Sequence, residues 1–404
     1  MSQPRTRLVL RPEEASIPAG HGLHRLPLIG GAIGILGIVG VAVLGGGQPQ
    51  QMYAAWLVAF LFFLSLALGS LYFVLIHYAV QAGWGIVVRR LAEIGASTIP
   101  LFALLFVPII LGMRSLYPWT VPGAADHDAA LRWKAPFLNP GFFLTRAGIY
   151  FALWSIMALA WSRASRRQDA TGDLAISERL RRFSGPALLL LALTQTFAAF
   201  DWIMSMTPDW YSTIFGVYFF SGAFVSAAAL LSLVVVLLRG SGLLRDVIGI
   251  GHLHDLGKLV FAFSCFWAYI AFSQFFLIWY GNIPEETIWY RARLDGSWKA
   301  ASAILAVGHF IVPFFFFMGR TMKRRPLALA SGAAWVLLMH LLDIHWLVMP
   351  TVRKGVAAPS LLEIAALLGV GGVFVATAGW LMRRQPLVPV KDPRLPESLS
   401  MSEA

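Results

Sequence analysis

Two ionisable residues, His340 and Asp343, stand three positions apart inside an apolar stretch of the chain. Residues three apart lie on the same face of a helix, so the two side chains are predicted to lie side by side. A carboxylate beside an imidazole stabilises the imidazolium and can pass protons near neutral pH. The pair therefore has two interpretations: a proton relay, or a buried polar contact that fixes one helix against its neighbours.

Further ionisable residues fall within or beside other apolar stretches. Such a group in hydrocarbon is costly unless it is paired or wetted, so each is a functional candidate. They are predicted to form a cytoplasmic layer and an outer layer, with His309 and His340 between them. The cytoplasmic layer comprises His77, Glu93, His252, His254, Asp255 and Lys258, and the outer layer comprises Asp201, Asp343, His345 and Glu363. This distribution suggests two polar half-paths that face opposite sides of a membrane. For Glu93 and for the group around Asp255, an ion pair at the interface is the simpler explanation.

The composition identifies the medium that surrounds these residues. Of the 404 residues, 58% are hydrophobic and only 13% are charged, whereas a soluble domain has roughly 25% charged residues. A soluble globular protein is therefore excluded. A helix needs about 20 apolar residues to cross a bilayer, and ten stretches qualify. They are 26 to 46, 53 to 80, 91 to 111, 141 to 163, 180 to 204, 211 to 238, 254 to 281, 298 to 319, 326 to 349 and 359 to 382.

The distribution of basic residues predicts the orientation. Most of the 32 lysines and arginines lie in the two tails and the even-numbered loops, in runs such as the one from Arg320 to Arg325. Cytoplasmic loops carry this excess, so both termini are expected in the cytoplasm. The net charge of +12 thus reports topology and contact with lipid, and nucleic-acid binding is not expected.

Two short matches indicate an internal repeat. Leu91 to Gly95 resembles Leu253 to Gly257, and in both Asp201 to Pro208 and Asp343 to Pro350 a proline follows an acid by seven residues. The fold is therefore expected to be an all-α polytopic membrane protein with two four-helix bundles, formed by helices 2 to 5 and 6 to 9. Glycine-rich helices 1 and 10 flank the bundles and are candidates for packing against other subunits or against each other. The boundaries are a tail at 1–25, helix 1 at 26–52, bundles at 53–210 and 211–352, helix 10 at 353–382, and a tail at 383–404.

Several familiar chemistries lack support in the sequence. The single cysteine, Cys265, excludes a disulfide framework and any iron–sulfur cluster within this chain. The segment from Gly251 to Lys258 lacks the spacing and the Ser or Thr of a phosphate-binding loop. Three interpretations stay open from the residues alone: a cofactor-free subunit of a quinol oxidoreductase, a proton-coupled secondary transporter, or a structural anchor. Against transport, prolines inside the spans do not fall at corresponding positions of the two repeats.

Two long segments carry a family resemblance. FDWIMSMTPDWYSTIFGVYFFSGAFVSAAALL, at 200 to 231, and GHLHDLGKLVFAFSCFWAYIAFSQFFLIWYGNIPEETIWY, at 251 to 290, resemble the NrfD-like integral membrane subunits of bacterial alternative complex III, most closely those of the ActF type. The resemblance covers essentially all ten predicted helices. It implies two four-helix bundles plus two flanking helices, in the bacterial cytoplasmic membrane.

The resemblance also implies an assembly and an activity. The complex is a quinol:cytochrome c oxidoreductase with a second NrfD-like subunit, an iron–sulfur subunit and multihaem cytochrome c subunits. Haem c and iron–sulfur clusters are thus expected on partners, with quinol as the substrate of the complex and no cofactor in this chain. Subunits of this type are proposed to take part in proton translocation. Asp201, Asp343, Asp255, His254, His309 and His340 match the polar positions that such a path would use.

Overall fold

The computed structural model describes residues 10–11 and 13–400, and every regular element in that part of the chain is a helix. Ten helical stretches in the described residues are long and apolar enough to cross a membrane, as the sequence predicts. These spans are Gly22–Gly45, Pro49–Ala79, Ile86–Leu111, Pro140–Thr171, Leu174–Met206, Phe215–Gly240, Ile250–Gly281, Trp298–Met318, Pro326–Thr351 and Leu361–Met382. The chain is therefore built as a multi-pass membrane protein.

Some spans consist of one helix and others of several. The elements that form most of the spans are α1 (Leu26–Gly45), α2 (Pro49–Ala79), α3 (Ile86–Ala96), α4 (Ile99–Leu105), α5 (Val107–Leu111), α9 (Pro140–Thr171), α10 (Leu174–Trp202), α11 (Phe215–Gly240), α12 (Ile250–Gly281), α14 (Trp298–Ala306), the π-helical η4 (Val307–Ile311), α15 (Val312–Met318), α17 (Pro326–Val348) and α18 (Leu361–Met382). The remaining short elements lie at the ends of spans or outside them. They are η1 (Gly22–Arg25), α6 (Met113–Leu116), η2 (Pro118–Thr120), α7 (Ala124–His127), α8 (Ala129–Lys134), η3 (Met204–Met206), α13 (Pro284–Ala292), α16 (Arg320–Arg324), η5 (Met349–Thr351) and α19 (Leu395–Ser400).

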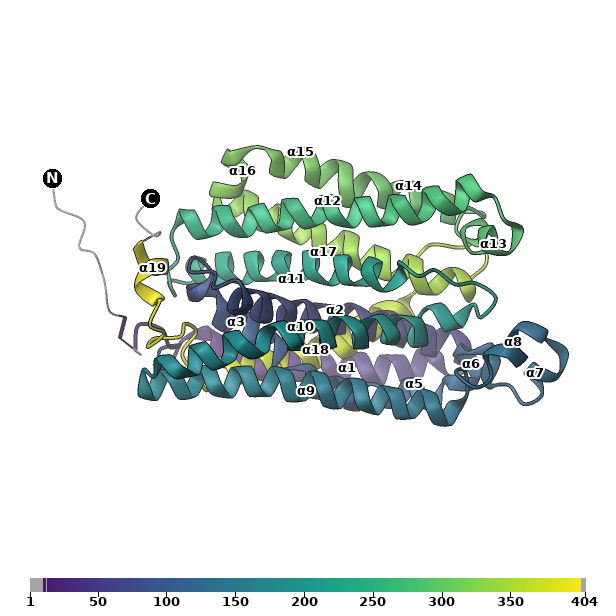
Figure 1. The fold of residues 1–404 in the computed structure, drawn as a ribbon, viewed down its shortest axis with the longest axis horizontal. Helices are drawn as coiled ribbons and strands as arrows, with labels where there is room; N and C mark the ends of the chain where they lie inside the picture. Colours follow the sequence, from purple (N-terminus) through teal and green to yellow (C-terminus); the bar gives the residue numbers. More distant parts are fainter. Residues whose placement is uncertain (1–9, 12, 401–404) are drawn as a thin grey trace.

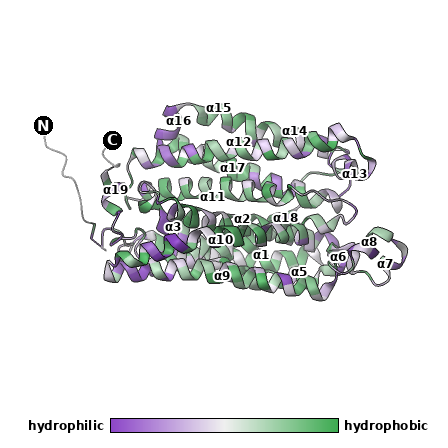
Figure 2. Ribbon diagram, viewed as in Figure 1, coloured by the Kyte–Doolittle hydropathy of each residue, from purple (hydrophilic) through white to green (hydrophobic). Residues whose placement is uncertain are grey.

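The long helices run roughly along one axis, as Figure 1 shows. Helices α6 to α8 and α13 lie at one end, here called the distal end. The terminal end carries α16, α19 and both ends of the described chain. Apolar residues dominate the middle of the helices, whereas the most hydrophilic segments gather near the two ends (Figure 2). Both ends of the described part of the chain lie at the terminal end, as an even number of crossings requires, and the prediction that this end faces the cytoplasm follows from its basic residues.

Helices α2 and α11 form the centre of the molecule. Helix α2 is buried along most of its length, and its neighbours include α3, α10, α11, α17 and α18. Helix α11 packs against α2, α10, α12 and α17. A Cβ atom added to Gly69 of α2 would lie 2.1 Å from the carbonyl oxygen of Ala223 on α11, so only glycine permits this approach. The two central helices thus connect the first half of the chain to the second.

Helices α1 and α18 pack along a line of glycines. A Cβ atom on Gly37 would lie 2.1 Å from the backbone nitrogen of Gly369, and one on Gly372 would lie 2.3 Å from that of Gly34. Small residues allow such close approach between membrane helices. Of the two roles expected for these glycine-rich helices, packing within the same chain is the one that the structure contains.

The predicted repeat has a local counterpart at two acids. Helix α10 carries Asp201 and continues into the short turn η3, and helix α17 carries Asp343 and continues into η5. The assignment of 53–210 and 211–352 to two copies of one unit stays a prediction.

Candidate functional site

The carboxylate of Asp343 lies buried between three helices, with 1% of the residue exposed. The hydroxyl of Tyr218, on α11, donates a hydrogen bond to Oδ1. The indole Nε1 of Trp267, on α12, donates to Oδ2 at 3.0 Å. Both donors are uncharged, so they solvate the carboxylate and leave its negative charge in place.

His340 lies one helical turn before Asp343 on α17 and faces the same neighbour. A Cβ atom on Gly222 would lie 3.0 Å from Cε1 of His340 and 3.6 Å from Oδ2 of Asp343, so glycine makes room for both side chains. The prediction that His340 and Asp343 lie on one face of the helix is therefore confirmed. The Nε2 atom of His340, however, lies 2.8 Å from Oγ of Ser65 on α2, a residue 275 positions away. Ser65 thus joins the first half of the chain to this site.

His309 reaches the same region from an irregular helix. Pro313 has no N–H to donate to the carbonyl of residue 309, and the preceding segment, η4, is π-helical. Within this π-helical segment the carbonyl of Gly308 accepts a hydrogen bond of 2.7 Å from Nε1 of Trp335. Single π-helical turns are frequent at functional sites, and this one contains the imidazole.

The His309 ring stacks on the indole of Trp267, with ring centroids 4.0 Å apart and planes 26° apart. Its centroid lies 6.4 Å from that of the His340 ring. Among the described residues, both nitrogens of His309 and Nδ1 of His340 are buried with no hydrogen-bond partner. Buried polar atoms normally have partners, so these three nitrogens set the site apart from a satisfied polar contact.

Six residues therefore form one site, here called the Asp343 cluster: Ser65, Tyr218, Trp267, His309, His340 and Asp343. They come from α2, α11, α12, η4 and α17. A neutral imidazole has one nitrogen free to accept a proton, and a nearby carboxylate stabilises the imidazolium that results. The arrangement is chemically suited to holding a proton in a buried place and releasing it again.

Asp201, the equivalent acid of the first half, has a different environment. Arg146 on α9 donates from Nε to Oδ2 at 2.8 Å and from Nη2 to Oδ1 at 2.7 Å, and Tyr150 donates to Oδ2 at 2.8 Å. The guanidinium also lies over the ring of Phe137, 3.8 Å from its centroid. A bidentate pair with this geometry neutralises the carboxylate, so Asp201 is suited to fixing α10 against α9.

Two more predicted residues, His345 and Glu363, form a pair of their own. Nδ1 of His345 lies 2.7 Å from Oε2 of Glu363, and Oε1 of Glu363 accepts a hydrogen bond from Arg353 at 3.1 Å. Ser360 caps α18 and shares the same carboxylate. This group joins the distal ends of α17 and α18.

The predicted residues at the terminal end are divided between two groups. Glu93 pairs with Arg90 at 2.8 Å and with Arg89 at 3.4 Å, and the His77 ring stacks on Phe73, with centroids 3.7 Å apart. Asp255 pairs with Lys258, and Nδ1 of His254 lies 3.9 Å from its carboxylate. Each acid has a basic partner within four residues, in agreement with the ion-pair explanation.

Of the ten predicted site residues, the structure thus brings Asp343, His340 and His309 together and places the others in separate groups. Sequence reasoning missed Tyr218, Trp267, Ser65 and Arg146. Arg146 had a signal, because it lies inside a predicted span. The described residues contain no group of three or more His, Cys, Asp or Glu placed to hold a metal ion.

No protein-family model matches the chain. No curated protein matches it either.

Proposed function

We propose that this chain is a membrane subunit of a respiratory quinol:cytochrome c oxidoreductase and that its Asp343 cluster carries protons through the middle of the membrane. The observation behind the proton role is a set of three buried imidazole nitrogens that have no hydrogen-bond partner among the described residues, beside a carboxylate whose side-chain donors there are neutral groups. A structural contact would use those nitrogens, whereas a relay needs at least one of them free.

A proton can be held at two imidazoles in the cluster. In the described part of the chain neither Nδ1 nor Nε2 of His309 has a hydrogen-bond partner, so either can accept a proton once the ring is neutral. Nδ1 of His340 has no partner among the residues that the structure describes, and its Nε2 contacts Ser65, whose hydroxyl donates to the carbonyl of Phe62 at 2.6 Å and can accept from the imidazole. The carboxylate of Asp343 supplies the negative charge that favours a proton on either ring. The step is a transfer between neighbouring groups and needs no chemistry beyond proton exchange.

The proposed route leaves the cluster toward the terminal end along α2. Ser65 is followed on the same helix by Tyr72, whose hydroxyl donates to Gln195 at 3.1 Å, and by His77. Twelve residues of helix from Ser65 to His77 span about 18 Å. The polar groups on α2 are therefore too far apart for direct contact, and each would be a separate point on the proton route. Toward the distal end the next ionisable group along α17 is His345.

The assembly is proposed from the resemblance of 200 to 231 and 251 to 290 to NrfD-like subunits. On that basis the partners are a second NrfD-like subunit, an iron–sulfur subunit and multihaem cytochrome c subunits, and this chain holds no redox cofactor. The proposed location is the bacterial cytoplasmic membrane, with the terminal end in the cytoplasm.

Purification in mild detergent tests the assembly. Mass spectrometry of the co-purifying chains and an optical spectrum of the preparation are expected to show cytochrome c and iron–sulfur subunits. If the chain is isolated alone or as a colourless homo-oligomer, the oxidoreductase assignment is wrong and a proton-coupled transporter becomes the leading function.

The proton role is tested in the intact complex with Asp343→Asn. We expect fewer protons released per electron, or a slower rate of release, because the amide cannot carry the charge that stabilises an imidazolium. The matched control is Glu285→Gln, which makes the same chemical change at an exposed position of α13. Unchanged stoichiometry and rate in Asp343→Asn would rule out a role for this residue.

A further inference from the structure

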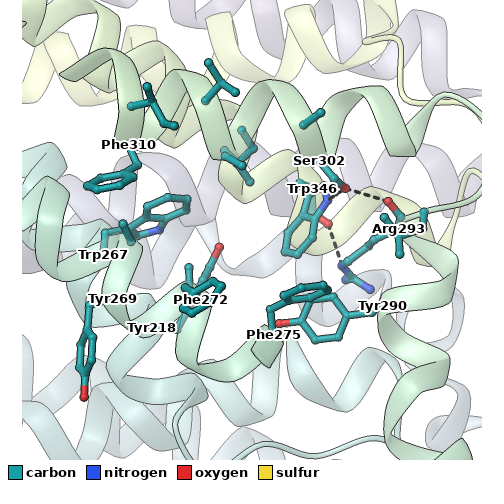
Figure 3. Close-up of a pocket in the computed structure, with 18 of the residues that line it drawn as sticks. Tyr218, Trp267, Tyr269, Phe272, Phe275, Tyr290, Arg293, Ser302, Phe310 and Trp346 are labelled. Carbon is teal, nitrogen blue, oxygen red and sulfur yellow. Dashed lines mark hydrogen bonds between the residues drawn. The ribbon is translucent and has the colours of Figure 1, made fainter. Parts of the chain in front are cut away.

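A groove of about 860 Å³ lies between α12 and the segment formed by α14, η4 and α15. It reaches from Arg293 and Ser302 at one end to Trp267 and Phe310 at the other (Figure 3). Several residues of its wall, including Tyr269, Phe272 and Ile311, are among the exposed hydrophobic residues of the molecule. The groove therefore opens on the surface that faces lipid and has a size typical of ligand sites.

Polarity changes along the length of the groove. The charged residues of the wall, Arg293 and Lys299, lie next to α13 and at the start of α14, at the distal end. Toward the membrane middle, the wall consists of apolar and aromatic side chains such as Trp267, Phe310 and Phe314. The wall from Cys265 to Phe275 follows α12 for about 15 Å. A ligand that fits has a polar or anionic head near the interface and an apolar tail that points inward.

Arg293 indicates the charge of the head. It is 1% exposed, and its guanidinium donates to three carbonyls, those of Trp346 at 3.2 Å, Trp289 at 2.9 Å and Leu347 at 2.7 Å. It also lies over the ring of Trp289, 3.2 Å from the centroid. In the described part of the chain, no carboxylate forms an ion pair with it. A buried cation without a counter-charge is costly, and burial lowers the pKa of Arg293 from its ordinary value.

The other polar groups at this end are also suited to an anion. Lys299 is exposed and adds a second positive charge. The hydroxyl of Tyr290 accepts a hydrogen bond from Gln274 at 3.1 Å and keeps its own proton to donate, because burial raises the pKa of Tyr290 to about 12. Of the two acids on the first turn of α13, Glu285 is exposed to solvent and Glu286 is half-buried, and neither lines the groove. An anionic head is therefore expected to bind at Arg293 and Lys299.

We propose that this groove binds one anionic phospholipid, with its phosphate at Arg293 and Lys299 and one acyl chain along the aromatic wall of α12. Phosphatidylcholine carries the same phosphate, but its choline adds a positive charge beside Arg293 and Lys299, so a zwitterionic lipid is expected to bind less tightly. The bound chain would contact Trp267 and Tyr218, which line the groove and donate to Asp343. The inference does not depend on the proposed function, because it rests on the shape and charge of the groove.

Native mass spectrometry of the delipidated protein, purified with any partners that accompany it, tests the inference. The probes are phosphatidylglycerol and phosphatidylcholine with identical acyl chains. We expect one phosphatidylglycerol to be retained with roughly tenfold higher affinity than phosphatidylcholine, since the choline of the latter places an extra positive charge near Arg293 and Lys299, and one charge interaction in a partly buried site has about that effect. Equal retention of the two lipids would overturn the proposal, because it would show that the net charge of the lipid does not affect binding in this groove.

Two substitutions at exposed positions locate the site without disturbing the core. Ala306→Trp fills the groove, and Lys299→Gln removes a charge at the head position. Both are expected to reduce phosphatidylglycerol retention about fivefold or more. The matched controls are Ala152→Trp, at an exposed position of α9, and Arg114→Gln, at an exposed position of α6. Neither control should change the retention of phosphatidylglycerol. If Ala306→Trp retains phosphatidylglycerol as well as the wild type, the lipid is bound elsewhere and the proposal is wrong.

A water-soluble headgroup separates a lipid site from a site for free phosphate. Glycerol 3-phosphate carries the charge without the acyl chains, so it should not displace the lipid at millimolar concentration. Displacement by glycerol 3-phosphate would show that the acyl chain contributes nothing, and the assignment of a lipid would fail.

Discussion

Trp267 and Asp343 are joined by a hydrogen bond of 3.0 Å between the indole nitrogen and Oδ2, although they lie on α12 and α17. The same indole stacks on His309 and forms part of the wall of the lipid-facing groove. One side chain thus contacts the carboxylate, an unpartnered imidazole and the groove. A change in what contacts the groove side of the Trp267 ring is therefore expected to alter the environment of the Asp343 carboxylate.

The first prediction concerns the second donor to Asp343. Tyr218→Phe removes the hydroxyl and leaves Oδ1 without its donor, which should lower the free energy of unfolding by about 1 to 3 kcal/mol. A titration from mild to denaturing detergent, followed by tryptophan fluorescence, measures the change. Tyr269→Phe, at an exposed position, is the control. A loss below about 0.5 kcal/mol for Tyr218→Phe would mean that the hydroxyl contributes little.

The second prediction concerns the ion pair of the first half. Arg146→Met leaves the Asp201 carboxylate buried with Tyr150 as its remaining side-chain donor among the described residues, and should cost about 3 to 5 kcal/mol. Adding Asp201→Leu removes the orphaned charge, so the double variant should be more stable than Arg146→Met alone. The same detergent titration measures all three proteins. A double variant less stable than the single one would contradict the assignment of a structural lock.

The third prediction concerns the contact between α1 and α18. Gly37→Ala places a Cβ atom where Gly369 already lies, so the helices must separate, at a cost of about 1 to 3 kcal/mol. Gly31→Ala is the matched control, because a Cβ atom there meets nothing within 4 Å and alanine favours the helix by about 0.5 to 1 kcal/mol. Thermal unfolding compares the two variants. Equal midpoints would show that the two helices are not held at this distance.

The fourth prediction concerns pH and the C-terminal segment. Arg394 donates to Glu397 at 2.9 and 2.6 Å, and these hydrogen bonds lower the pKa of Glu397. The contribution of this pair to the order of the C-terminal segment is fully present above the ordinary glutamate value of about 4.3 and is lost as the pH falls through the lower folded value. A spin label at exposed Ser400, in a Cys265→Ala background, should therefore become more mobile below about pH 4.

Glu397→Gln provides the control for this pH dependence, because the amide does not titrate. The label in that variant should give the same spectrum across the range, apart from changes at other acids. If the two proteins respond identically to acid, another group controls the docking of α19.

The sequence predicted the ten spans because each one is a long apolar run, and the membrane allows few alternatives to a helix for such a run. It also placed His340 and Asp343 on one face, since their spacing is a property of the helix itself. The spans at 140–171 and 174–206 extend beyond the apolar runs, where residues such as Arg166 and Arg179 continue the helix into the interface.

The partners of these residues could not be predicted in the same way. Ser65 and His340 are 275 positions apart, and only the packing of α2 against α17 brings them together. The direct contact expected between His340 and Asp343 was replaced by contacts with Ser65, Tyr218 and Trp267. Helical periodicity fixes the direction of a side chain on its own helix, but the choice between neighbouring helices depends on the whole packing arrangement.

The glycine contact between α1 and α18 has a consequence for biogenesis. Gly37 is synthesised roughly 330 residues before Gly369, which at bacterial translation speeds is a delay of about 20 to 60 s. During that interval α1 is in the bilayer while its partner does not yet exist, so lipid or an insertion factor must cover its glycine face. The packing of the helices is completed only when α18 contacts α1. A truncation before α18 would leave the glycine face of α1 exposed to the membrane quality-control machinery.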